Sequence, residues 1–170
     1  MWLTSANALS ASRIVMAPFA AACIYSESWQ LAASIFAAAV LSDLLDGPLA
    51  RRRGEVTRLG AVVDHGADAF FVIVLLAALA AKEFFTALLP CMVGVAFLQY
   101  VIGSGAHKKH PLKASQLGRY NGILYFVIAG VPIVGNALGL SWLPLWVSRY
   151  GAWLLIVSTV VSIADRSRSS

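Results

Sequence analysis

Apolar residues occur along this chain in six long stretches, separated by short connections that carry most of the charge. A helix that crosses a bilayer needs about 20 predominantly apolar residues. Each stretch approaches or exceeds that length, so the pattern predicts an all-α, polytopic membrane protein with six transmembrane helices. The six stretches cover residues 6–25, 29–50, 59–81, 84–103, 120–138 and 143–164.

Composition supports a membrane protein and excludes several other classes. Of the 170 residues, 59% are hydrophobic and only 12% are charged, and the mean hydropathy is +0.77. Average soluble domains have about a quarter charged residues, so a soluble globule, a coiled coil and a disordered chain are all excluded. No internal repeat or change of composition divides the chain. We therefore expect a single membrane domain over residues 1–170.

The basic residues predict how the protein is oriented. The connections 26–29 and 136–142 contain no Lys or Arg, whereas the segments 51–58 and 107–119 contain four basic residues each. Basic loops stay on the cytoplasmic side, so both termini are expected to be cytoplasmic, together with these two segments. The net charge of +5 then indicates contact with anionic lipid headgroups, and no nucleic acid partner is expected.

Four aspartates lie within or at the cytoplasmic ends of the second and third stretches, where a carboxylate costs at least about 2.5–3.5 kcal/mol to insert. Asp43 and Asp46 are one helical turn apart on one face, and Asp64 and Asp68 are spaced by four. The two helices are joined by a short basic connection and are expected to be antiparallel neighbours. The four carboxylates should therefore converge near the cytoplasmic end of one cavity.

Convergent carboxylates of this kind predict divalent metal binding. They cannot all stay ionised beside one another without a cation, and oxygen-only ligands favour hard ions such as Mg²⁺, Mn²⁺ or Ca²⁺. A pair of such ions would neutralise a pyrophosphate and clamp a phosphoryl transfer. Gly47, Ala50 and Gly60 would let a ligand lie against the helix backbones, and Arg51 can pair with a phosphate.

From Asp43 to Asp68 the sequence reads D-x2-D-G-x2-A-R-x8-G-x3-D-x3-D. These eight positions resemble the complete signature of the CDP-alcohol phosphotransferase family. The opening residues 7–13, followed by Pro18, are similar to the start of bacterial members that make phosphatidylglycerol phosphate. This resemblance implies phospholipid biosynthesis by a metal-dependent transferase.

The resemblance also implies roles for individual residues. In the family, all four aspartates (Asp43, Asp46, Asp64 and Asp68) hold two divalent ions, Mg²⁺ or Mn²⁺. Asp68 would also act as the general base that removes the proton of the acceptor alcohol, after which the alkoxide attacks the phosphorus on the lipid side and CMP leaves. The residues expected to bind the CDP-lipid are Gly47, Ala50, Arg51, Thr57 and Gly60.

The expected donor is CDP-diacylglycerol, and the resemblance implies a homodimer in the bacterial cytoplasmic (inner) membrane with its active site facing the cytoplasm. Residues 115–121 are similar to a glycine-lysine element of members that use glycerol phosphate, with Arg119 in place of the lysine. Glycerol 3-phosphate is therefore the expected acceptor, with Arg119 and Lys113 as candidate ligands of its phosphate. Inositol phosphate or another alcohol is the alternative acceptor.

Two further interpretations of the acidic residues have to be weighed. The same carboxylates could serve a divalent-cation carrier, but a carrier needs a path to the far side, and membrane-depth carboxylates occur only near the inner end. His65 lies between two aspartates of the signature, but its helical angle turns it away from them. We therefore expect His65 to pack against a neighbour rather than bind metal.

Overall fold

The computed structural model describes the backbone of residues 5–53, 58–103, 116–140 and 145–168. It describes the side chains of a smaller set, residues 10–44, 64–102, 116–140 and 145–167. This part of the chain forms helices joined by short turns, which confirms the all-α prediction. Most predicted helix ends lie within four residues of the observed ones. The helices are α1 (Ser5–Tyr25), α2 (Trp29–Arg53), α3 (Arg58–Ala81), α4 (Leu88–Gly103), α5 (Gln116–Ala137) and α6 (Leu145–Arg168).

The start of α4 differs from the sequence prediction, which placed it at residue 84. The chain reverses after α3 through Glu83, whose φ of 61° lies in the left-handed region, and the Phe84 amide donates a hydrogen bond to the Leu79 carbonyl. The Thr86 hydroxyl then accepts a hydrogen bond from the Leu88 amide, as a helix cap does. Residues 84–87 are apolar enough to resemble a helix, but they form the turn that precedes it.

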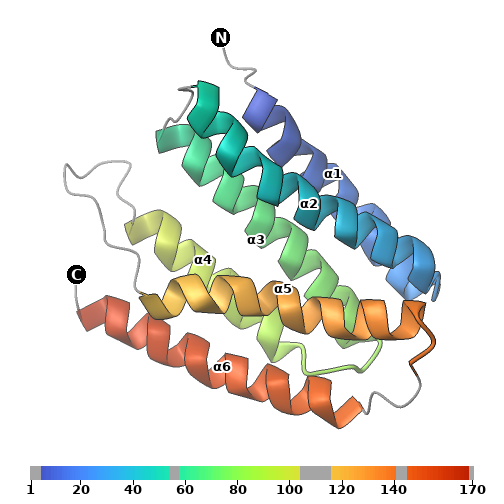
Figure 1. Ribbon diagram of the computed structural model, residues 1–170. Helices are drawn as coiled ribbons and strands as arrows, with labels where there is room; N and C mark the ends of the chain where they lie inside the picture. Colours follow the sequence, from blue (N-terminus) through green and yellow to red (C-terminus); the bar gives the residue numbers. More distant parts are fainter. Residues whose placement is uncertain (1–4, 54–57, 104–115, 141–144, 169–170) are drawn as a thin grey trace.

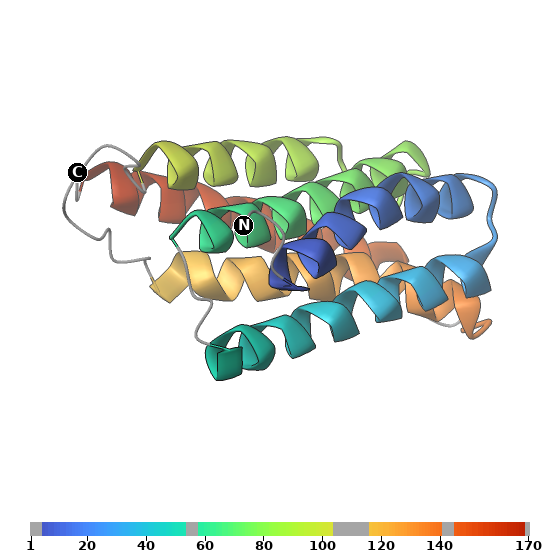
Figure 2. The ribbon, with the colours of Figure 1, turned by 90° about the horizontal axis from the view of Figure 1, so that it is seen from above.

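The six helices form a closed ring (Figures 1 and 2). Helix α1 packs against α2 and α3, α2 against α5, α5 against α6, α6 against α4, and α4 against α3, while α3 also touches α5. As predicted, α2 and α3 approach one another, since the rings of Phe36 and Phe71 stack, but most of the backbone packing of both helices is with α1. Alanines buried on α1 and α2 (Ala17, Ala20, Ala32 and Ala39) allow this close approach.

Both ends of the described chain lie at one end of the bundle (Figure 1). The start of α1 and the end of α6 lie there, together with the ends of α2 and α4 and the starts of α3 and α5. Among the residues whose side chains are described, three helical segments are long and apolar enough to cross a membrane: Asp64–Ala81, Gln116–Ala137 and Leu145–Ser167. Shorter apolar helical segments are Ser10–Tyr25, Trp29–Leu44 and Leu88–Ile102, so crossing by α1, α2 and α4 stays a prediction.

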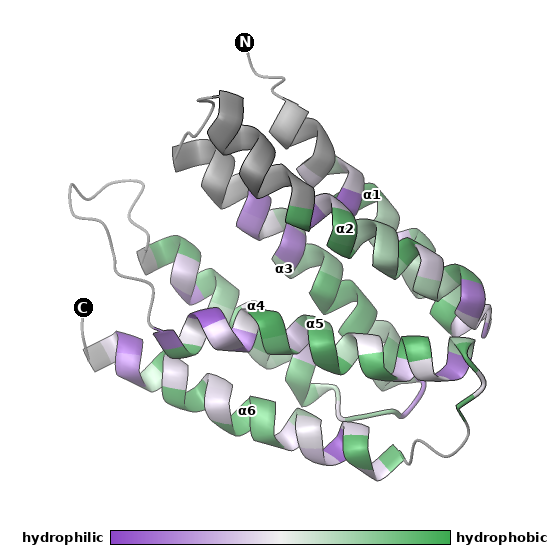
Figure 3. Ribbon diagram, viewed as in Figure 1, coloured by the Kyte–Doolittle hydropathy of each residue, from purple (hydrophilic) through white to green (hydrophobic). Residues whose placement is uncertain are grey.

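Hydrophobic residues predominate along the described helices (Figure 3). Many of the large ones are exposed on the outer surface: Phe19 on α1 is 64% exposed and Leu154 on α6 is 73% exposed. Monomeric soluble proteins rarely show contiguous apolar patches of this kind, whereas lipid chains solvate them without cost. Inside the ring, the stacked rings of Phe36, Phe71 and Phe126 join α2, α3 and α5, with centroids 6.3–6.5 Å apart.

Candidate active site

Three of the four signature aspartates meet in the structure. Asp43 projects from α2, and Asp64 and Asp68 project from one face of α3, as a spacing of four residues requires. One carboxylate oxygen from each lies within 4.8 Å of the others. Asp46 is on α2, in a part of the helix whose side chains lie outside the described residues. The predicted convergence therefore holds for these three carboxylates.

The centre of this cluster is a cation that the sequence analysis did not single out. Arg13, on α1, is completely buried and contacts all three carboxylates. Its Nη1 donates to Asp43 at 3.2 Å, its Nη2 donates to Asp64, and its Nε lies 2.8 Å from Asp68. The Ser10 hydroxyl, one turn earlier on α1, also donates to Asp64 at 2.8 Å. A buried guanidinium is tolerated only when it is paired in this way.

The cluster fits a divalent cation by two observations. Asp68 Oδ1 is buried and accepts no hydrogen bond from any described residue, since the nearby Arg13 Nε is not aligned for one. When the three carboxylates are ionised, their negative charge also exceeds the single positive charge of Arg13, on a set of oxygen ligands. Hard divalent ions prefer such ligands. The side chains of Asp43, Asp64 and Asp68 are 41%, 33% and 22% exposed, so they remain accessible while Arg13 lies behind them.

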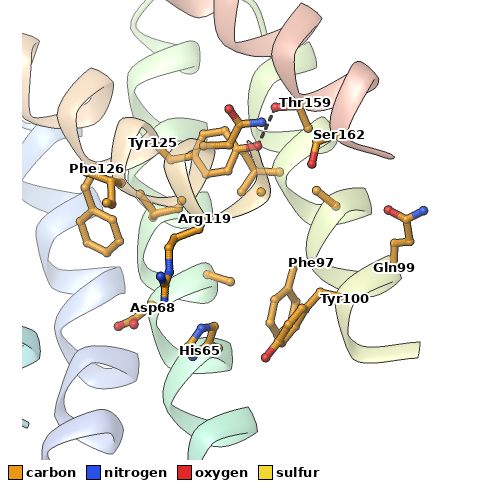
Figure 4. Close-up of a pocket in the computed structure, with 18 of the residues that line it drawn as sticks. His65, Asp68, Phe97, Gln99, Tyr100, Arg119, Tyr125, Phe126, Thr159 and Ser162 are labelled. Carbon is orange, nitrogen blue, oxygen red and sulfur yellow. Dashed lines mark hydrogen bonds between the residues drawn. The ribbon is translucent and has the colours of Figure 1, made fainter. Parts of the chain in front are cut away.

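A cavity of about 450 Å³ extends from the aspartates between α3, α4, α5 and α6. Arg119 from α5 and Arg166 from α6 line it together with the three carboxylates. Figure 4 shows Arg119 and Asp68 on the same side of this cavity. Much of the remaining wall is apolar, and includes Val72, Val93, Phe97, Phe126 and Ile163. A single space therefore offers anionic ligands for a metal, cationic ligands for a phosphate, and an apolar boundary that limits water.

His65 takes part in the wall of this cavity and is not among the residues grouped around a metal position. Its ring stacks on Tyr100 of α4, with centroids 5.5 Å apart and an interplanar angle of 17°. The Arg166 guanidinium lies 5.8 Å from the centre of the same Tyr100 ring. The predicted packing role of His65 is confirmed, and the stack connects α3, α4 and α6 beside the aspartates.

The structure describes the other predicted site residues unevenly. Arg119 lines the cavity, as its assignment to the acceptor requires. Thr57 and Lys113 lie outside the described residues. The predicted CDP-lipid ligands Gly47, Ala50, Arg51 and Gly60 lie in α2 and α3, in turns whose side chains are not described.

Sequence reasoning missed Arg13, Arg166 and Asn121 as components of the site. Arg13 lies inside an apolar stretch, and the cost of burying a charge, applied above to the aspartates, applies to it equally. Arg166 was counted only toward the orientation of the chain, because its position near the C-terminus suits that role. Asn121, which lines the cavity, lies in the segment 115–121 that resembles the glycine-lysine element, but that resemblance pointed only to Arg119.

Comparison with known proteins agrees with this geometry. The chain matches the CDP-alcohol phosphatidyltransferase family model over residues 3–164. It is 27% identical to enzymes of Shigella flexneri serotype 5b and Escherichia coli K12, and 26% identical to one of Salmonella choleraesuis. Each alignment has 162 residues and covers 91% of this chain and 86% of the relative, and all three relatives are named CDP-diacylglycerol–glycerol-3-phosphate 3-phosphatidyltransferase. The chain therefore belongs to the CDP-alcohol phosphatidyltransferase family and is a phosphatidyltransferase.

Proposed function

We propose that this enzyme transfers the phosphatidyl group of CDP-diacylglycerol to glycerol 3-phosphate and releases CMP. One observation carries the proposal: the aspartate cluster and two arginines, Arg119 and Arg166, line the same cavity. Transfer to a phosphorylated alcohol needs groups of both charges. The carboxylates would hold metal ions and activate the reacting groups, and the guanidiniums would hold the acceptor phosphate. The names of the relatives support glycerol 3-phosphate as the acceptor.

Asp43, Asp46, Asp64 and Asp68 are the residues that would hold two divalent ions, Mg²⁺ or Mn²⁺. Such ions, when bound, supply the positive charge that neutralises a pyrophosphate and its leaving group. The all-oxygen cluster supports this assignment, and so does the Asp68 oxygen that pairs with Arg13 but accepts no hydrogen bond in the described part of the chain. Arg13 keeps the three described carboxylates close together, so the aspartates need little rearrangement to present a ligand set.

Asp68 is the proposed general base. It lies in the wall of the cavity, within reach of a bound acceptor, and it is the least exposed of the three described carboxylates. It takes the proton of the acceptor hydroxyl as the oxygen attacks the phosphorus on the lipid side of the pyrophosphate. The new bond is the phosphodiester of the product, and the bond that breaks releases CMP.

Arg119 and Arg166 are the proposed ligands of the acceptor phosphate, and Lys113 is a third candidate from the sequence. Guanidinium groups bind phosphate with paired hydrogen bonds. Arg166 is additionally positioned by its stack on Tyr100. Inositol phosphate carries the same charged group, so these arginines do not distinguish it from glycerol 3-phosphate. The CDP-lipid is proposed to bind Gly47, Ala50, Arg51, Thr57 and Gly60.

We also propose that all six helices cross the bacterial cytoplasmic membrane, with the aspartate end of the bundle in the cytoplasm, and that the enzyme is a homodimer. The distribution of basic residues supports the orientation. The large apolar side chains exposed on the outside of the ring supply surface for both lipid and a second copy.

The test is CMP release by detergent-purified protein given CDP-diacylglycerol, Mg²⁺ or Mn²⁺, and one acceptor at a time. Glycerol 3-phosphate, inositol phosphate, inositol and serine form the panel. Turnover with glycerol 3-phosphate, abolished by a chelator and by Asp68→Asn but not by Glu27→Gln, is expected. Turnover with inositol phosphate alone would show that inositol phosphate, not glycerol 3-phosphate, is the acceptor. Uptake of Mn²⁺ into proteoliposomes without CMP release would contradict the proposed transfer and favour a divalent-cation carrier.

A further inference from the structure

The cavity has a second polar region, built from uncharged side chains on three helices. We call it the neutral wall, and it consists of Gln99 on α4, Asn121 on α5 and Ser162 on α6. Asn121 is only 2% exposed and Ser162 only 5% exposed, so both belong to the interior of the bundle. A polar group buried this deeply normally has a hydrogen-bond partner.

In each of the two amide side chains of the neutral wall, one polar atom is hydrogen-bonded and the other has no partner among the described residues. The Asn121 Oδ1 accepts a hydrogen bond from the Ser158 hydroxyl at 2.7 Å, but its Nδ2 is buried and has no partner among the described residues. The Gln99 Nε2 donates to the Ile163 carbonyl and to the Ser167 hydroxyl, both at 3.0 Å. The Gln99 Oε1 is buried without a partner in the same described part. The hydrogen bonds of Asn121 Oδ1 and Gln99 Nε2 hold the amide groups in place. Within the described part of the bundle, the Asn121 Nδ2 therefore remains as a donor without a partner, and the Gln99 Oε1 as an acceptor without one.

The neighbouring Tyr125 and Thr159 behave differently, although they line the same cavity. The Tyr125 hydroxyl lies 2.6 Å from the Thr159 oxygen, and the Thr159 hydroxyl donates to the Leu155 carbonyl at 2.6 Å. Because the Thr159 proton is used in that bond, Tyr125 is the donor of the pair. The two hydroxyls are therefore already hydrogen-bonded by described residues, unlike the Gln99 Oε1 and the Asn121 Nδ2.

There is room for a ligand beside Asn121. The next residue, Gly122, also lines the cavity, and a Cβ built on it would meet no atom within 4 Å. By contrast, a Cβ on Gly66 would meet the Phe97 ring at 3.5 Å. The open space at Gly122 therefore lets a small polar molecule approach the wall beside Asn121.

We propose that the neutral wall binds an uncharged hydroxyl of the acceptor, distinct from the hydroxyl that attacks, and that Asn121 determines specificity for polyol phosphates by donating to it. The inference rests on the proposed function, since it assumes a phosphorylated alcohol in this cavity. A hydroxyl oxygen can accept a hydrogen bond, which matches the Asn121 Nδ2 that has no partner among the described residues. A phosphate does not suit this wall, because its residues carry no positive charge to offset burial of an anion.

The experiment compares two acceptors that differ by one hydroxyl. Glycerol 3-phosphate attacks through its terminal hydroxyl and keeps the central one, whereas 3-hydroxypropyl phosphate lacks the central one. The readout is kcat/KM for CMP release with saturating CDP-diacylglycerol. Wild-type protein is expected to prefer glycerol 3-phosphate by about 10- to 100-fold. The reason is that 3-hydroxypropyl phosphate lacks the central hydroxyl and so leaves the buried amide of the wall without a hydrogen-bond partner.

Asn121→Leu removes the donor at similar volume and is expected to reduce that preference to about threefold or less. Tyr125→Phe is the matched control, since it deletes a polar atom of the same cavity that is already paired, and it is expected to keep the wild-type preference. Asn121→Ser serves as a second variant if the leucine protein does not fold, and it should also lose most of the preference.

The outcomes separate this inference from the proposed function. If wild-type protein uses neither phosphorylated acceptor, the proposed function fails and the inference fails with it. If wild-type protein uses both acceptors equally well, the proposed function stands and the inference is overturned. If the Asn121 variants lower kcat/KM for both acceptors by the same factor, Asn121 supports only the fold and the inference is again overturned.

Discussion

Replacing Arg13 by methionine tests the observation that one arginine holds the acidic cluster together. The substitution keeps most of the side-chain volume and removes the only described cation in contact with Asp43, Asp64 and Asp68. Removing one partner of a buried ion pair costs about 3–5 kcal/mol. Two of the three carboxylates are at least a third exposed and contribute on the smaller scale of surface pairs. We therefore expect about 3 kcal/mol of destabilisation in the absence of divalent ions.

The assay is thermal unfolding of detergent-purified protein, with chelator and with Mn²⁺. By the scaling of soluble domains of this size, about 3 kcal/mol lowers the Tm by about 6–12 °C. Mn²⁺ should restore more of the Tm in Arg13→Met than it adds to wild-type protein, because the variant cluster has one positive charge fewer. Arg149→Met, an exposed arginine that donates to the Glu83 carbonyl, is the control and should shift the Tm by no more than about 2 °C. An Arg13→Met protein that melts like wild type in chelator, and gains no more from Mn²⁺, would refute the reasoning.

Three other predictions concern catalysis, acceptor binding and pH. Asp68→Asn should keep CDP-diacylglycerol binding within about threefold by calorimetry while CMP release falls at least about 100-fold, and near-normal turnover would exclude Asp68 as the base. Arg119→Ala should raise the KM for glycerol 3-phosphate at least about tenfold more than the KM for CDP-diacylglycerol, whereas equal increases would indicate a role in the fold. At the other end of the bundle, the hydrogen bond from Lys82 lowers the pKa of Glu27 below its ordinary value of 4.5, so the pair stabilises the fold above that value and ceases to do so as the pH falls through the lowered pKa. The small Tm difference between wild type and Glu27→Gln, measured from pH 7 to pH 3, should therefore disappear at the acid end, and a difference that grows there would contradict the assignment.

The sequence predicted what depends on local pattern. Apolar length gave the helices, and the spacing of Asp64 and Asp68 placed both carboxylates on one face. It did not predict what depends on the order of packing. The short connection between α2 and α3 correctly suggested that their side chains meet, but it did not show that α1, with small buried residues such as Ala17 and Ala20, packs against both of them. The position of Arg13 follows from that packing.

The polar interior was equally hidden from sequence reasoning. Asn121 lies in the same family-like segment as Arg119, but its burial against Ser158 of α6 appears only in the folded bundle. Arg119 was a candidate because a family element surrounds it, whereas Arg166 had no such context. Residues whose role comes from three or more helices meeting are the ones that a one-dimensional pattern leaves out.

The packing of α1 against both α2 and α3 also bears on the order in which the bundle assembles during synthesis. Helix α1 precedes α2 and α3 in the chain, and it brings the Arg13 charge that the later aspartates contact. During synthesis α1 emerges before α2 and α3, so this guanidinium is available when the acidic helices form. If α2 and α3 insert into the membrane as proposed, Asp43, Asp64 and Asp68 do so with a positive charge to pair with rather than as isolated anions. Arg13 therefore holds these three carboxylates together without a metal ion, and the proposed metal would bind a cluster that is already assembled.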